Sequence, residues 1–158
     1  MTEILLIIFA ITLIYMAIAN RLSTYINILM VQGTLLFGVT FIELNQINIG
    51  NLMFILSETI IVKAIAIPYF MKYIIKKNKI TREAEPFVSN FFSVVIITCI
   101  IFGSFLLSKS INDPNLNKTY FVIAISALFS GLYFIISRRK IITHVIGFVI
   151  IENGVFIL

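Results

Sequence analysis

Charged side chains are scarce in this chain of 158 residues. They make up 12% of it, whereas hydrophobic residues make up 60%. Soluble domains carry about 25% charged and about 45–50% apolar residues. So few charges cannot cover the surface of a water-soluble enzyme, and so much apolar content also excludes intrinsic disorder. The composition therefore indicates a polytopic membrane protein.

Residues that usually build chemical sites are also few. Cys99 is the single cysteine, so no intrachain disulfide is possible, and His144 is the single histidine, so the chain cannot build a His/Cys metal cluster by itself. The sequence has no Gly-rich phosphate loop, no cofactor-binding motif and no Ser/His/Asp set. We therefore expect no catalytic residue, no metal and no cofactor in this chain.

Apolar segments, by contrast, fill most of the sequence. A helix needs about 20 apolar residues to cross a hydrocarbon core of roughly 30 Å. Six segments approach that length, at residues 4–19, 26–42, 52–75, 87–107, 120–136 and 141–158. They are continuous and do not alternate, which favours helices over barrel strands. The sequence predicts an all-α integral membrane protein, one domain over residues 1–158, with six transmembrane helices.

Lysine and arginine are distributed unequally between the loops. Two of them, Lys109 and Lys118, lie on one side of the predicted helices, whereas nine lie on the other side, at Arg21, Lys72, Lys76, Lys77, Lys79, Arg82, Arg138, Arg139 and Lys140. The positive-inside rule makes the side with nine charges cytoplasmic. We therefore expect both termini outside a cell (inner) membrane. Topology alone explains the cluster at 76–82, although it could also touch anionic lipid or an acidic partner.

The two ends of the chain raise separate questions. Residues 17–19 are small enough for a signal-peptide cleavage site, but no positive charge precedes the first segment, so we expect no cleavage. The last segment has 18 residues and reaches about 27 Å, which is barely a span. This length suggests a truncated portion of a longer protein.

Lys63 is the most informative residue. It lies near the middle of the third segment, where an unpaired charge costs at least ~2.5–3.5 kcal/mol. A buried lysine beside a carboxylate can take up and release a proton, which indicates proton or ion handling. The alternative is a static ion pair that locks helix packing. Pro68 follows in the same segment and should disturb the turn before it, because it cannot donate to the carbonyl of Ala64.

Glu152 lies eleven residues after Ile141, so about 16 Å into the sixth segment. It suits a proton relay, or it is a protonated acid that joins helices by hydrogen bonds. Glu58 is a weaker candidate, about 140° around an α-helix from Lys63, so we expect the partners of each on other helices or chains. His144, beside the basic turn at 138–140, is a candidate for proton entry or a satisfied interface histidine.

Two stretches resemble a known family. Residues 137–154 read SRRKIITHVIGFVIIENG, a basic turn, a Gly-aromatic pair and then Glu-Asn-Gly, and residues 62–68 read VKAIAIP, with proline five residues after lysine. In this order they resemble the hydrogenase-4 component E family, over nearly the whole chain. The part from the fifth segment onward is similar to the K-type subunit of NADH dehydrogenase. It departs from that subunit's Gly-x-Glu-x-x-x-Asn, because here Gly147 is followed only later by Glu152 and Asn153. The family also continues with another helix, so this protein is either shortened or works without that element.

The resemblance implies a non-catalytic membrane subunit of a group 4 nickel–iron hydrogenase or formate hydrogenlyase-type complex, related to respiratory complex I. Its partners would be hydrogenase and antiporter-like subunits, which would hold the nickel–iron and iron–sulfur centres. Lys63 and Glu152, with Glu58 and His144 as weaker candidates, would contribute to a proton or sodium path. The alternatives are a structural or assembly subunit of the same complex, and an independent small transporter.

Overall fold

The computed structural model describes residues 1–43, 53, 55, 57–79, 87–111, 113 and 116–158. Within these ranges the chain is helical and has no β-strand. The α-helices are α1 (Thr2–Ile18), α2 (Leu22–Glu43), α4 (Ile67–Lys77), α5 (Asn90–Ser110), α6 (Lys118–Ser137) and α7 (Ile141–Ile157). A π-helix, η2 (Glu58–Ala66), leads directly into α4. The expectation of an all-α fold is confirmed for this part of the chain.

Three helices, α2, α5 and α6, are long and apolar enough to cross a membrane. The helices α1 and α7 are also apolar, but each has 17 residues. In all five the sequence offers long runs without an internal proline, so the helix continues until the loop.

The third predicted segment is the main correction. The sequence predicted one continuous α-helix over residues 52–75, in which Pro68 disturbs the preceding turn. The structure has a π-helix over Glu58–Ala66 in place of α-helix, and Pro68 lies in the first turn of α4. Proline has no N–H to give and clashes with the preceding turn. A π-helix, in which each N–H bonds five residues back, accommodates such a disturbance and is frequent at functional sites.

Two helix boundaries also differ from the prediction. The helix α2 begins at Leu22, because the amides of Thr24 and Tyr25 already bond the carbonyl of Arg21. The helix α5 begins at Asn90 rather than at Phe87. The Phe87 amide bonds the Ser137 carbonyl at 2.9 Å, so Phe87 joins the end of α6 and does not start a helix.

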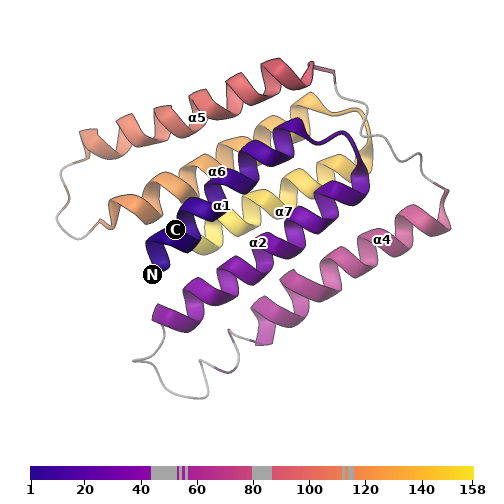
Figure 1. Cartoon of the computed structure of the whole chain (residues 1–158), viewed down its shortest axis with the longest axis horizontal. Coiled ribbons are helices and arrows are strands. Elements are labelled where there is room, and N and C mark those ends of the chain that lie inside the picture. Colours follow the sequence, from indigo (N-terminus) through magenta and orange to yellow (C-terminus); the bar gives the residue numbers. More distant parts are fainter. Residues whose placement is uncertain (44–52, 54, 56, 80–86, 112, 114–115) are drawn as a thin grey trace.

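The helices form a bundle in which α1, α2, α6 and α7 run side by side, with α5 along α6 and α4 along α2 (Figure 1). The helices α6 and α7 form a tight hairpin through residues 138–140, as the sequence predicts. A Cβ on Gly131 would lie 2.7 Å from the Gly147 carbonyl oxygen, and one on Gly147 would lie 2.8 Å from that of Gly131. Only glycine allows the two backbones to approach so closely.

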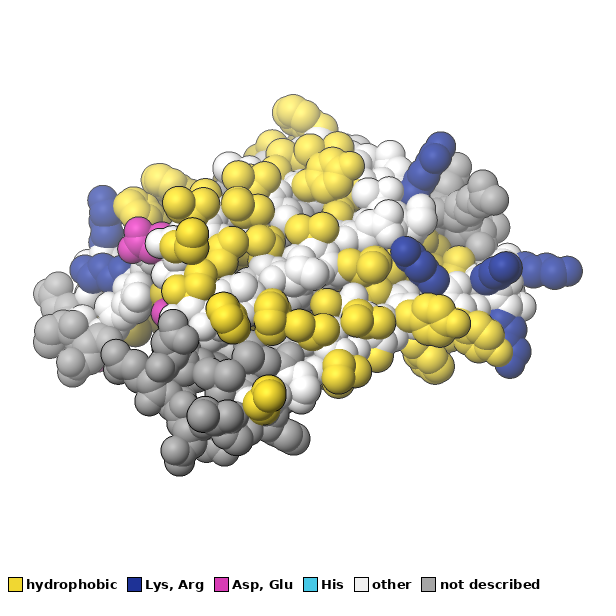
Figure 2. Space-filling view, turned by 60° about the horizontal axis from the view of Figure 1, so that its bottom comes forward, with side chains coloured by type: hydrophobic (Ala, Val, Ile, Leu, Met, Phe, Trp, Pro, Cys, Tyr) yellow, Lys and Arg dark blue, Asp and Glu magenta, His cyan; other side chains and the backbone are white. Residues whose placement is uncertain are grey.

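The surface between the two ends of the bundle is rich in apolar side chains. Exposed examples lie on α1, on α4 and on α5, where Phe91, Phe92 and Phe102 are each at least 60% exposed. Figure 2 shows hydrophobic side chains along the middle of one face, with most of the lysine and arginine at one end and acidic side chains at the other. Such a belt is expected where lipid or protein, rather than water, covers the surface.

Candidate functional site

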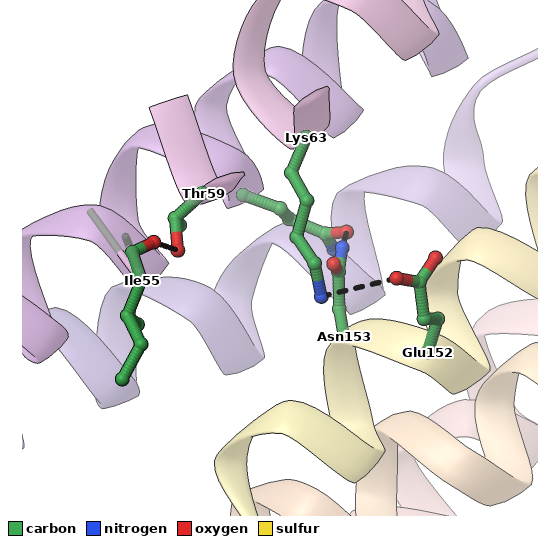
Figure 3. A network of polar contacts seen from close by, with 6 residues as sticks. Ile55, Thr59, Lys63, Glu152 and Asn153 are labelled. Atoms are coloured by element: carbon green, nitrogen blue, oxygen red, sulfur yellow. Dashed lines mark hydrogen bonds and ion pairs between the residues drawn. The ribbon is translucent and has the colours of Figure 1, made fainter. Parts of the chain in front are cut away.

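Lys63 and Glu152 meet in the structure. The Lys63 Nζ lies 3.4 Å from the Glu152 Oε1, which makes the two residues an ion pair. Lys63 projects from η2 and Glu152 from α7, and the two side chains point toward each other (Figure 3). The lysine side chain is 4% exposed, whereas the glutamate side chain is 43% exposed. The ammonium group is therefore buried within the chain, whereas the carboxylate is accessible from outside it.

Gly33 explains how η2 comes close enough for this contact. A Cβ on Gly33 would lie 2.9 Å from both the Cα and the backbone nitrogen of Ala64, the residue after Lys63. No larger residue fits there without displacing a backbone. Gly33 therefore sets how closely the lysine-bearing segment packs against α2.

The ammonium group has a second favourable neighbour. The Lys63 Nζ lies 4.4 Å from the centre of the Phe156 ring, which is on α7 one turn after Glu152. A cation over an aromatic face gains about 0.5–2 kcal/mol, more when it is desolvated. The helix α7 thus supplies both groups that stabilise the charge, one turn apart.

A chain of hydrogen bonds starts at the next residue of α7. The Asn153 amide nitrogen donates to Gln32 Oε1 at 3.3 Å, and Gln32 Nε2 donates to Thr12 Oγ1 at 2.9 Å. Thr12 in turn donates to the Phe9 carbonyl at 2.6 Å. Asn153 and Gln32 are fully buried. This series of hydrogen bonds runs from α7 through α2 to α1. It could not be predicted from the sequence, because the residues that form it are far apart in the sequence.

The Asn153 side chain keeps one unused acceptor. Its Oδ1 is buried and has no hydrogen-bond partner among the described residues. A buried acceptor without a partner is costly, and buried polar groups are normally hydrogen-bonded to protein or ordered water. This oxygen can therefore accept a further hydrogen bond.

The Glu-Asn-Gly motif acts in three directions. Glu152 contacts Lys63 of η2, and Asn153 contacts Gln32 of α2. Gly154 packs on α6, where a Cβ would lie 2.9 Å from the Ala124 carbonyl oxygen. These three consecutive residues of α7 therefore contact η2, α2 and α6, respectively.

Two adjoining cavities lie beyond Phe156. The first, of about 260 Å³, is lined by Thr40, Glu43, Phe156 and neighbouring apolar side chains. The second, of about 340 Å³, shares Glu43 and Tyr120 with it and also reaches Asn117 and Leu158. Together they extend from the aromatic neighbour of Lys63 to the end of the bundle where α2 ends and α6 begins.

The structure places His144 and Pro68 away from the contact between Lys63 and Glu152. His144 Nε2 lies 2.9 Å from the Arg138 carbonyl oxygen. It is eight residues, or about 12 Å of helix, before Glu152. Pro68 is buried five residues after Lys63. The Glu58 side chain lies outside the described residues, and the α-helical spacing that separated it from Lys63 does not apply within η2.

Arg138 is a residue whose setting the sequence did not reveal. From the sequence, Arg138 is one of nine basic residues assigned to the cytoplasmic side, yet in the structure only 1% of it is exposed. None of its three side-chain nitrogens has a hydrogen-bond partner among the described residues. Its guanidinium carbon lies 5.7 Å from the Tyr25 ring centre and 5.6 Å from that of Phe134. Its neighbours in sequence, Arg139 and Lys140, gave no sign of which of the three would be buried.

The described residues contain no group of three His, Cys, Asp or Glu side chains that could hold a metal ion. Comparison with protein families, with curated proteins and with solved structures finds no match for this chain. The resemblance to hydrogenase-4 component E is therefore carried by the two quoted stretches of sequence alone.

Proposed function

We propose that this chain is a non-catalytic membrane subunit of a complex I-related, hydrogenase-type complex, and that it helps to carry protons or sodium ions across the cell (inner) membrane. The observation that carries the proposal is the Lys63–Glu152 ion pair, which joins the last turn of η2, just before α4, to α7. All six helical segments would cross the bilayer, with the basic end of the bundle toward the cytoplasm.

The geometry of the pair supports ion handling. A single contact of 3.4 Å is longer than the ~2.7–2.9 Å of a strong charge-assisted hydrogen bond. The contact therefore does not have the geometry of the strongest ion pairs. One proton moved from the ammonium to the carboxylate also turns the pair into two neutral groups. Ionisable groups that alternate in this way within a bilayer mark ion pathways.

Polar features on both sides of the pair support a path. Toward the end with Glu43, the two adjoining cavities give space for water. Toward α1, the amides of Asn153 and Gln32 do not titrate, but they can orient water molecules that pass protons. The unused Asn153 Oδ1 would accept a hydrogen bond from such a water.

The open side of Glu152 supports a partner subunit. A carboxylate that is 43% exposed would be expensive against lipid tails. A neighbouring subunit with a lysine or a hydroxyl at the same depth would remove this cost. The resemblance identifies antiporter-like subunits as that neighbour, and it assigns the nickel–iron and iron–sulfur centres to further subunits.

Ion translocation in membrane vesicles tests the proposal. The variants Lys63→Ala and Glu152→Gln should lower redox-driven ion uptake by tenfold or more, while co-purification with the partner subunits measures assembly. Matched controls are Lys77→Ala and Glu3→Gln, because both residues are exposed at helix ends. If both site variants assemble and pump normally, the proposal is wrong. Isolation of the tagged wild-type chain without hydrogenase-type or antiporter-like subunits would contradict the membership in the complex.

A purely structural role for the pair is the second candidate. It is favoured by the close backbone contact at Gly33 and by the hydrogen-bond chain through Gln32, both of which fix η2 and α7 in place. Under this alternative, neutral replacements that conserve shape would affect assembly and nothing else.

A further inference from the structure

A groove lies between the start of α2 and the C-terminal half of α4, at the basic end of the bundle. Its volume is about 480 Å³. Arg21, Lys72 and Lys76 line it together with the apolar side chains of Leu22, Ile26 and Ile75. The groove thus combines three cations with an apolar wall. It is separate from the ion pair and its cavities, which have other lining residues.

The three cations have no strong acidic partner of their own. Within the described ranges, no carboxylate oxygen lies within 4.0 Å of any of them. The Lys72 Nζ donates to the sulfur of Met30 at 3.8 Å. A thioether is a weak acceptor and carries no charge. The positive charge of the groove is therefore available to an external anion.

The local backbone makes the same end of the groove attractive to anions. Lys72 and Lys76 are four residues apart on α4, so their side chains lie on one face of the helix. The helix α2 begins at Leu22 and has no acidic residue in its first turn. The positive end of its dipole therefore lies beside Arg21 and is not neutralised within the helix.

We propose that this groove binds the phosphate headgroup of an anionic phospholipid, with the start of one acyl chain against Ile75. A phosphodiester accepts hydrogen bonds from arginine and lysine. Ile75 is partly exposed and offers apolar surface to the chain, whereas Leu22 and Ile26 are buried and form the floor of the groove. A free phosphate would leave that apolar wall without a partner, so the lipid is the better fit. Basic pockets between helices on the cytoplasmic side are suited to such headgroups. The site requires the basic end at a membrane surface and does not depend on the ion path.

Lipid retention tests the site. The intact complex is reconstituted in nanodiscs of phosphatidylcholine with a minor fraction of phosphatidylglycerol, extracted in mild detergent, and analysed for bound lipid by mass spectrometry. We expect the triple variant Arg21→Gln/Lys72→Gln/Lys76→Gln to retain at least about tenfold less phosphatidylglycerol than the wild type. The reason is that each cation near the membrane surface contributes to headgroup binding. A monodisperse elution profile confirms that the variant has folded and assembled.

The matched control removes the same charge from the same end but outside the groove. The variant Lys77→Gln/Lys79→Gln/Arg139→Gln should retain phosphatidylglycerol as the wild type does, because none of these residues lines the groove. Equal loss in both variants would mean general electrostatic attraction, and no loss in either would mean no site. Displacement of the lipid by inorganic phosphate or glycerol phosphate would show a site for soluble anions. Each of these results would overturn the proposal.

Discussion

Gly33 of α2 lies directly against the backbone of Ala64, the residue that follows Lys63. A Cβ at position 33 would be 2.9 Å from the Ala64 Cα and nitrogen, a distance that real Cβ atoms essentially never show. The contact joins the middle of α2 to the π-helix that carries the lysine. The position of the ion pair therefore depends on the absence of a side chain at residue 33.

Gly33→Ala should destabilise the protein. The added methyl group forces η2 away from α2, and overpacking of this kind costs typically about 1–3 kcal/mol. The melting temperature of the purified protein in detergent measures the effect, and Gly103→Ala on α5 is the control. A Cβ on Gly103 meets nothing within 4 Å, so there the change should be neutral or slightly stabilising because alanine favours helix. Equal melting temperatures for the two variants would contradict the close contact.

Gln32→Leu should also lower stability. Gln32 is fully buried and bridges Asn153 to Thr12, so its loss leaves the Asn153 amide without a partner. An unsatisfied buried polar group costs about 1–3 kcal/mol. Thermal unfolding checks this, with Thr34→Val as the control, because Thr34 is exposed on the same helix and bonds only its own turn. If Gln32→Leu melts no lower than Thr34→Val, the hydrogen-bond chain is not stabilising.

Arg138→Ala should destabilise the α6–α7 hairpin more than Arg139→Ala does. Arg138 fills space beside the Tyr25 and Phe134 rings and is 1% exposed, so its truncation leaves a cavity as well as losing two cation–π contacts. Arg139 is exposed over the Phe87 ring, where such a contact contributes about 0.5–1 kcal/mol. The decrease in melting temperature of each variant relative to the wild type measures its loss of stability, and the decrease should be larger for Arg138→Ala. A smaller loss for Arg138→Ala would mean that the burial of this guanidinium is unfavourable overall.

The sequence predicts much of the fold, because long apolar runs without internal proline have few alternatives to helices. The helix α7 begins at Ile141 as predicted, since the basic residues at 138–140 end the previous run. The π-helix was not predictable in this way. Pro68 indicates a disturbed turn before it, but it does not specify how the turn rearranges, because that choice depends on the fit of η2 against Gly33.

The candidate site was predictable only in part. The cost of a charge in an apolar segment singles out Lys63 and Glu152 individually. Their mutual contact could not be derived, since it depends on which faces of η2 and α7 meet. The same limit hid Gln32, whose partners Thr12 and Asn153 are 20 and 121 residues away in the sequence. Arg138 was hidden for another reason, because three adjacent cations give no periodicity that would identify the buried one.

Ion translocation by a complex that carries Lys63→Met together with Glu152→Met tests the central claim most directly. Replacing both members of an ion pair by apolar side chains of similar volume leaves neither charge unpaired and is often neutral or stabilising, so the account predicts assembly with partner subunits. It also predicts that redox-driven ion uptake into vesicles falls at least tenfold, because neither position of the pair can then exchange a proton. Uptake at the wild-type rate by the assembled double variant would contradict the account and leave the pair a structural link between η2 and α7.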